Sequence, residues 1–172
     1  MLFTTSIFTS LLAAVASAAV LPARQPATIW QSPFSGTIMA PAADQAMAFG
    51  VGFPFDYQVS SWCEPAFAPF TVYLTAGAAP PVFDNITAEG ALADGAFAFE
   101  FGKFVVSRFG LPQEGTPPPT SLTMPTVDDL ALALAPETDF FLTVVEEFDG
   151  CPGSIAVEYS LTSVPLSFTL AT

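Results

Sequence analysis

The amino-acid sequence predicts an all-β protein, an antiparallel β-sandwich of about seven to nine strands. Apolar residues alternate with polar or small ones in most segments, which is typical of strands with one buried face. The 17 prolines favour turns and edge strands over helix interiors. The apolar share of 52% is high enough for a packed core, so the chain is not expected to be disordered.

The alternating segments place the strands along the chain. They predict strands at 53–59, 97–101, 154–162 and 164–170, and further strands are expected at 28–31, 37–40, 70–75 and 140–148. The alternation changes phase at Gly102-Lys103 and at Thr162-Ser163, where we expect a bulge, bend or turn. Segment 126–134 begins with capping-box spacing and predicts either a helix or a further strand. Between the apolar positions of three strands, solvent-facing acids are expected at Asp56, Glu100 and Glu158.

The first residues predict secretion. Residues 1–18 contain a short apolar stretch followed by Ala16-Ser17-Ala18, as at a signal-peptide cleavage site, although no Lys or Arg precedes it. The apolar stretch is too short to span a membrane, and no membrane span is expected elsewhere. We therefore expect residues 19–172 to form one secreted domain, extracellular or in a cell wall, with a proline-rich loop at 111–126.

Composition excludes several classes of function. The chain has 16 acidic and 3 basic residues, a net charge of −13, and no histidine. This charge disfavours nucleic acid, which needs Lys and Arg to neutralise phosphates. The absence of histidine excludes Ser-His-Asp and Cys-His nucleophiles and His-ligated zinc or copper. No cofactor and no metal site are expected, apart from calcium, which is left open.

Two short patterns gain meaning in a secreted protein. The only two cysteines, Cys63 and Cys151, are expected to form a disulfide, because secretory compartments are oxidising. Asn85 lies in Asn85-Ile86-Thr87, an acceptor pattern for N-glycosylation.

Segment 134–144, Leu-Ala-Pro-Glu-Thr-Asp-Phe-Phe-Leu-Thr-Val, resembles the start of strand F in fibronectin type III domains. Glu137 replaces the usual glycine of that motif, and Phe140 replaces its corner tyrosine. The resemblance implies an immunoglobulin/fibronectin-III-like β-sandwich. In that topology the loops that contain Cys63 and Cys151 lie at the same end of the sandwich.

The N-terminal half carries a second resemblance, through Trp30-Gln-Ser-Pro33, Ser35-Gly36-Thr37, Phe53–Tyr57, Trp62-Cys63 and Phe70–Gly77. These segments look like small secreted fungal proteins of basidiomycete type with an immunoglobulin-like fold. They are loosely similar to the N-terminal module of Ser/Thr-rich, GPI-anchored cell-wall proteins that are linked to β-glucan assembly. The resemblance implies a cell-wall setting but carries no catalytic motif.

Three kinds of site remain open. Paired carboxylates would suit an acid-active hydrolase, and the same acids are the candidates for calcium: Glu64, Asp84, Glu100, Asp128, Asp129, Glu146, Glu147 and Asp149. Aromatic residues in or beside predicted loops could stack on a sugar: Trp30, Phe34, Trp62, Phe67 and Phe70. Of these, Trp30, Trp62 and Phe67 are the candidates for a ligand platform. Core packing and solvated strand ends explain most of these residues as well.

The sequence therefore predicts a secreted, non-enzymatic protein that acts by binding or by structural association. The expected partners are a cell-wall polysaccharide or an extracellular protein. Two alternatives stay open: a carbohydrate-binding module for β-glucan or chitin, and an acid-active hydrolase that uses paired carboxylates.

Overall fold

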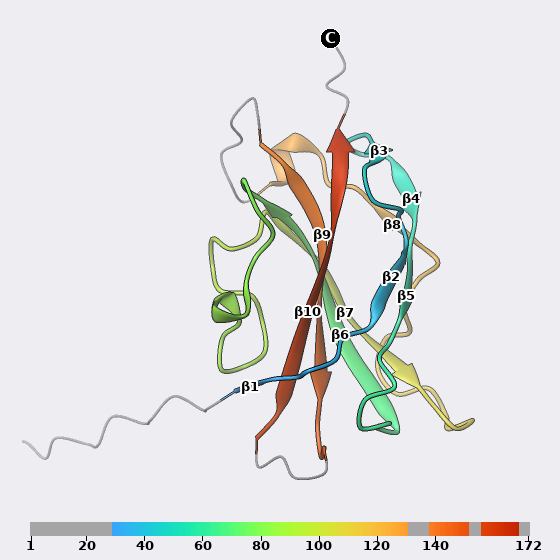
Figure 1. Ribbon diagram of the computed structural model, residues 1–172. Coiled ribbons are helices and arrows are strands. Elements are labelled where there is room, and N and C mark those ends of the chain that lie inside the picture. Colours follow the sequence, from blue (N-terminus) through green and yellow to red (C-terminus); the bar gives the residue numbers. More distant parts are fainter. Residues whose placement is uncertain (1–28, 131–137, 152–155, 169–172) are drawn as a thin grey trace, which may run out of the picture.

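The larger layer of the fold is a six-stranded sheet (Figure 1). The computed structural model describes residues 29–130, 138–151 and 156–168. The strand order is β1-β10-β9-β6-β7, and β3 also pairs with β10. The bounds are β1 Trp30–Gln31, β3 Gln45–Met47, β6 Phe67–Ala76, β7 Phe99–Ser107, β9 Phe140–Phe148 and β10 Glu158–Phe168. Strands β10, β9, β6 and β7 run antiparallel to their neighbours, whereas β1 and β3 lie parallel to β10 at its two ends.

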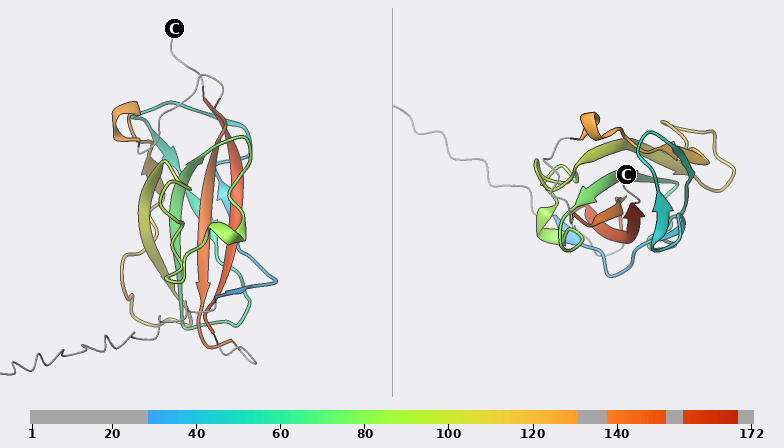
Figure 2. Two further views of the ribbon diagram at one scale, coloured as in Figure 1. Left: turned by 90° about the vertical axis from the view of Figure 1, so that its left-hand side faces the viewer. Right: turned by 90° about the horizontal axis from the view of Figure 1, so that it is seen from above.

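Two short strand pairs form the second layer. β2 (Thr37–Ala40) pairs with β5 (Asp56–Gln58), and β4 (Gly52–Pro54) pairs with β8 (Ser121–Thr123). This layer lies over one face of the large sheet (Figures 1 and 2). The main core is buried between the layers and includes Phe53, Phe55, Tyr57, Phe70, Val72, Leu74, Leu122, Met124, Leu142 and Val144. The fold is thus an all-β sandwich, as the alternating pattern predicts.

The opposite face of the large sheet is covered by segment 77–98. This segment contains the 3-10 turn η1 (Phe83–Asn85) and a bridge between Ile86 and Leu92. Ile86 and Leu92 pack with Tyr73, Val145 and Tyr159 in a second buried cluster. The sheet is therefore apolar on both faces along part of its length.

Several strands agree with the sequence prediction. β2 and β9 have the predicted bounds, and the bulge expected at Gly102 is present. Val72 pairs with Gly102 and Tyr73 pairs with Glu100, so one residue of β7 has no partner. Gly102 has φ 134°, which a residue with a side chain rarely adopts, so glycine accommodates the bulge.

The break expected at Thr162-Ser163 is wrong. β10 runs without interruption and pairs with β9 in one register from Glu158–Phe148 to Leu166–Phe140. The apolar residues change phase because the first part of β10 packs under the covering segment and the second part faces the main core. The change of phase marks a change of buried face, so it needs no bend.

Other segments depart from the prediction because their pairing partners are distant in sequence. Segment 53–59 is divided into β4 and β5, which pair with different strands, and β3 and β8 were not predicted. In segment 126–134 the capping spacing is used, since Asp129 accepts hydrogen bonds from the backbone and hydroxyl of Thr126. It caps only the 3-10 turn η2 (Val127–Asp129), and the rest of the segment from 131 lies outside the described residues.

The predicted signal peptide at 1–18 also lies outside the described residues. Within the described ranges, no helix has the length and apolar character needed to cross a membrane.

Candidate binding groove

A disulfide joins two loops at the lower end of the sandwich in Figure 1. Cys63 lies between β5 and β6, and Cys151 follows β9, so the bridge spans a sequence separation of 88. The Cα atoms are 5.0 Å apart, within the usual range for a disulfide. The predicted pairing is therefore present, and it connects loops at one end of the molecule as the resemblance implied.

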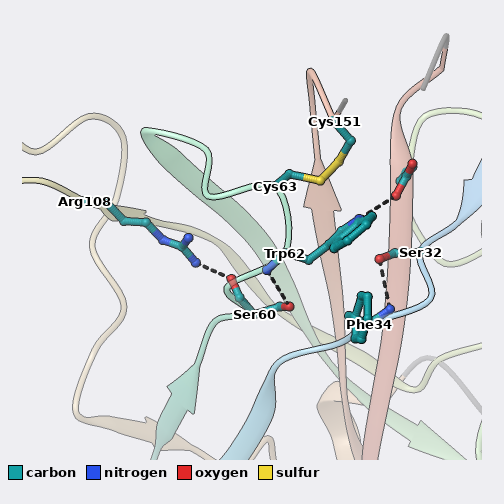
Figure 3. The surroundings of a disulfide bond; sticks show 8 residues. Ser32, Phe34, Ser60, Trp62, Cys63, Arg108 and Cys151 are labelled. Atoms are coloured by element: carbon teal, nitrogen blue, oxygen red, sulfur yellow. Dashed lines mark hydrogen bonds between the residues drawn. A yellow bond between two sulfur atoms is a disulfide. The ribbon is translucent and has the colours of Figure 1, made fainter. Parts of the chain in front are cut away.

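Two aromatic residues lie beside the disulfide (Figure 3). The ring centroids of Phe34 and Trp62 are 4.9 Å apart, and the rings are tilted by 42°. The indole N–H of Trp62 donates to Glu158 at 2.9 Å, which fixes the orientation of the ring. The Phe34 side chain remains 54% exposed.

The backbone presents both rings in the same way. Ser32 Oγ accepts from the Phe34 N–H at 3.2 Å, and Ser60 Oγ accepts from the Trp62 N–H at 3.1 Å. A serine hydroxyl that binds the backbone two residues later forms a compact local turn. Each aromatic side chain is thus presented by a serine turn at the end of a strand region (Figure 3).

A groove of about 430 Å³ opens beside these rings. One wall is residues 34–37, the other is residues 58–62, and Phe34 and Trp62 belong to opposite walls. β2 and β5 pair at Thr37–Gln58, so the groove begins where these two chain segments separate. The lining contains serine, threonine and glutamine side chains and no charged residue. We call this feature the aromatic groove.

The buried Glu146 carboxylate forms hydrogen bonds with both walls of the groove. One carboxylate oxygen, Oε2, accepts from the Gly36 N–H at 3.0 Å and from the Tyr57 hydroxyl at 2.8 Å. The other oxygen, Oε1, accepts from the Ser60 N–H at 2.9 Å. Glu146 is fully buried, whereas Gly36 and Ser60 both line the groove. A single buried carboxylate therefore sets the separation of the walls.

The close approach at Gly36 requires glycine. A Cβ atom at this position would lie well inside van der Waals contact with the Tyr57 hydroxyl and the Gln58 carbonyl oxygen. The backbone at Gly36 can reach the Glu146 carboxylate only because no side chain separates them.

The electrostatics of this anchor are dominated by burial. Burial raises the pKa of the Glu146 carboxyl above its ordinary value of 4.5, although its three hydrogen bonds and the nearby Arg108 guanidinium act in the opposite direction. The Arg108 guanidinium donates to the Ser60 carbonyl oxygen instead of forming an ion pair with Glu146. Burial, together with repulsion by the Glu146 carboxylate, also raises the pKa of Tyr57, so its hydroxyl stays a donor.

The structure separates the aromatic residues that the sequence suggested as a platform. Trp62 lines the groove with Phe34, whereas Trp30 and Phe67 lie in β1 and β6 and are not part of its lining. Trp30 is 41% exposed. Phe70 is a core residue at 1% exposure, so its suggested position near a loop surface is wrong. The alternating phase of β6 directs it toward Tyr57 in the main core.

The two acidic candidates in β9 do not form a carboxylate pair. Glu146 and Glu147 are adjacent, so they point to opposite faces of the sheet, and Glu147 forms an ion pair with Lys103 at 2.8 Å. Glu158, expected to face solvent, is buried at 7% exposure. That expectation is wrong because residue 158 lies on the inner face of β10, where the Trp62 indole covers it.

Glu158 also lies near the disulfide. In the described ranges, the groups of potential metal ligands include one that combines Glu158 with Cys63 and Cys151. The two sulfur atoms are bonded to each other and therefore offer no thiolate.

Sequence reasoning missed the groove and the anchoring role of Glu146. One signal was available: Glu146 is in phase with Leu142 and Val144, which places a carboxylate on the buried face of the strand predicted at 140–148. A carboxylate in that position requires hydrogen-bond donors from elsewhere in the chain. The identity of those donors depends on β2–β5 pairing, which the local pattern does not specify.

Comparison with known proteins yields no family: no family model, curated protein or solved structure matches the chain.

Proposed function

We propose that this protein is a secreted, non-enzymatic binding protein of the extracellular space or cell wall, and that the aromatic groove binds a neutral polysaccharide. The observation that carries the proposal is the pair Phe34 and Trp62 on opposite walls of an uncharged, hydroxyl-lined groove. The leader-like residues 1–18 and the disulfide support secretion.

The groove has the chemistry that a sugar ring requires. The apolar face of a pyranose packs on an aromatic ring, and its hydroxyls exchange hydrogen bonds with hydroxyl and amide groups. The groove volume of about 430 Å³ falls within the usual range of ligand pockets. Trp62 is held in place before any ligand arrives, which reduces the entropy lost on binding.

The uncharged lining favours a neutral polymer over an acidic one. The chain as a whole carries a charge of −13, so an anionic polysaccharide would be repelled at long range. β-Glucan and chitin are neutral, and they are the ligand classes that we propose.

The test is retention on insoluble β-glucan and chitin. Phe34→Ala should lower the retained fraction, with an apparent affinity loss of about tenfold or about 1.4 kcal/mol. Phe34 suits this test because its ring is 54% exposed and its loss should leave the core intact. Phe109→Ala is the matched control, since Phe109 is 71% exposed and is not part of the groove lining.

Two outcomes would contradict the proposal. If the wild-type protein is not retained on either polymer, or if Phe34→Ala and Phe109→Ala behave alike, the groove is not a polysaccharide site. Release of new reducing ends from either polymer would contradict the non-enzymatic part and favour the hydrolase alternative.

A further inference from the structure

The acceptor pattern at Asn85 lies in a well-defined turn on the outer side of the large sheet. Asn85 ends η1, and its Oδ1 accepts from the Val82 N–H at 2.9 Å. The side-chain amide is therefore held beside Val82, which is 61% exposed. This hydrogen bond uses the carbonyl oxygen of the amide and not the nitrogen Nδ2, which is the atom that a glycan would occupy.

The chain around Asn85 is anchored to the sheet. Ile86 is 7% exposed and Leu92 is 3% exposed, and both pack in the second buried cluster. The Asn85 carbonyl oxygen accepts from the Ala93 N–H at 2.8 Å, and the Thr87 N–H donates to Ala91 at 2.8 Å. A group attached to Asn85 would thus have a fixed position relative to the protein surface.

A hollow adjoins this turn. It has a volume of about 410 Å³ and is lined by Gln31, Pro81, Val82, Phe83, Asp84 and Leu161. Val82 is also the hydrogen-bond partner of the Asn85 side chain, so the amide is hydrogen-bonded to a residue that lines the hollow. Phe83 offers an aromatic ring and Asp84 a polar group in the same space, a combination that suits the first sugar of a glycan.

We propose that Asn85 carries an N-linked glycan and that its first N-acetylglucosamine lies in this hollow against Phe83 and Val82. The modification rests on the secretion part of the proposed function, because the donor is found in the secretory pathway. It does not compete with the aromatic groove, since the linings of the hollow and the groove share no residue.

The modification is the transfer of an oligosaccharide from a lipid diphosphate donor. The electron pair of Asn85 Nδ2 forms a bond to C1 of the sugar, and the bond from C1 to the diphosphate oxygen breaks. The lipid diphosphate leaves with the electron pair of the broken bond, and Nδ2 loses one proton to a base of the host transferase. Oδ1 is unchanged, so it continues to accept from the Val82 N–H.

Occupancy is tested by expression behind a foreign signal peptide in a eukaryotic secretory host, so that delivery does not depend on residues 1–18. We expect the secreted protein to lose mass with peptide-N-glycosidase F. Asn85→Gln should show no such loss, and Thr87→Ser should retain it. Secreted wild-type protein with the mass of the bare chain would overturn the proposal.

The position of the first sugar is tested by thermal unfolding of two trimmed forms. An endoglycosidase leaves one N-acetylglucosamine on Asn85. In a separate sample, peptide-N-glycosidase F removes the whole glycan and leaves aspartate, which still offers an acceptor oxygen to Val82. The form with one sugar should melt about 2–4 °C higher. In Phe83→Ala, occupancy should persist and the difference between its two forms should disappear.

Equal melting temperatures of the two wild-type forms would overturn the placement in the hollow. The two proposals fail separately. Glycosylated protein that binds neither polymer contradicts only the polysaccharide proposal, and secreted protein without a glycan contradicts only the proposal for Asn85.

Discussion

Glu146 is the residue on which the geometry of the aromatic groove depends. It is a fully buried carboxylate that accepts from both groove walls and from Tyr57. Hydrogen bonds to a charged group are stronger than neutral ones, but leaving their donors buried without a partner is costly. The anchor therefore stabilises the groove only while the carboxylate and its three donors are all present.

Glu146→Ala should lower the free energy of unfolding by about 3 kcal/mol or more, because the two N–H groups and the Tyr57 hydroxyl lose their acceptor. Glu147→Ala is the matched control: it removes the neighbouring carboxylate, which forms an ion pair with the exposed Lys103. Such surface pairs contribute about 0–1 kcal/mol. Urea unfolding measures both variants, and equal losses would contradict the anchoring role.

The pH dependence of stability has a defined sign at Glu146. Its pKa in the folded protein is raised above 4.5 by burial, so the folded state binds the proton more tightly than the unfolded chain. The corresponding stability is fully present below the unfolded pKa and is lost as the pH rises through the folded pKa. The groups that act on this carboxyl in the opposite direction are the Tyr57 hydroxyl, the backbone N–H groups of Ser60 and Gly36, and the Arg108 guanidinium.

The difference in unfolding free energy between wild type and Glu146→Gln isolates this effect from the other carboxyls. We expect that difference to shift against the wild type as the pH rises from about 4.5 to 7, since glutamine does not titrate. Urea unfolding at a series of pH values measures it. A difference that is constant, or that shifts toward the wild type, would contradict a raised pKa of this carboxyl in the folded protein.

At the scale of elements, local alternation predicts the long strands and fails at the short ones. β9 has its predicted bounds although its residues do not alternate strictly: it lies between β10 and β6, and seven of its nine residues are buried. The alternating pattern predicts two strands where the structure has the single strand β10, because the buried face of β10 changes along its length. Predicting this change would require knowing that segment 77–98 covers the outer face of the sheet. β3 and β8 have three residues each and are defined by distant partners.

The candidate site could be predicted only in part for the same reason. The positions of Trp62 and Phe34 in or beside predicted loops suggest both as ligand-binding residues, but the groove also needs their two chain segments, 34–37 and 58–62, to lie side by side. These segments meet through the pairing of β2 with β5, in which Ile38 lies opposite Tyr57. Tertiary pairing of this kind is not encoded in either segment alone.

The disulfide couples two elements at the end that holds the groove. Replacing both Cys63 and Cys151 with alanine should lower the free energy of unfolding by about 2–4 kcal/mol, because the bridge restricts a long loop in the unfolded chain. Urea unfolding of this double variant, beside the wild type with its disulfide intact, measures the effect. A change below about 0.5 kcal/mol would contradict a stabilising role for the bridge.

At the scale of the whole molecule, charge and fold act together. The net charge of −13 lies on a chain in which only 11% of residues are charged. Two of the acids, Glu146 and Glu158, are buried, whereas Asp56 and Glu100 are exposed. The uncharged groove is thus set in an acidic protein, which favours neutral ligands through long-range repulsion of anionic ones.

Trp62 fluorescence tests the central proposal most directly. Trp30→Phe leaves Trp62 as the only tryptophan in the chain, and soluble β-glucan or chitin oligosaccharides are then added. The account predicts a saturable change in emission with at least one of these ligands, which Phe34→Ala weakens about tenfold and Phe109→Ala leaves unchanged. Emission that stays constant with both ligands, or that responds equally in Phe34→Ala, would contradict the assignment of the aromatic groove as a polysaccharide site.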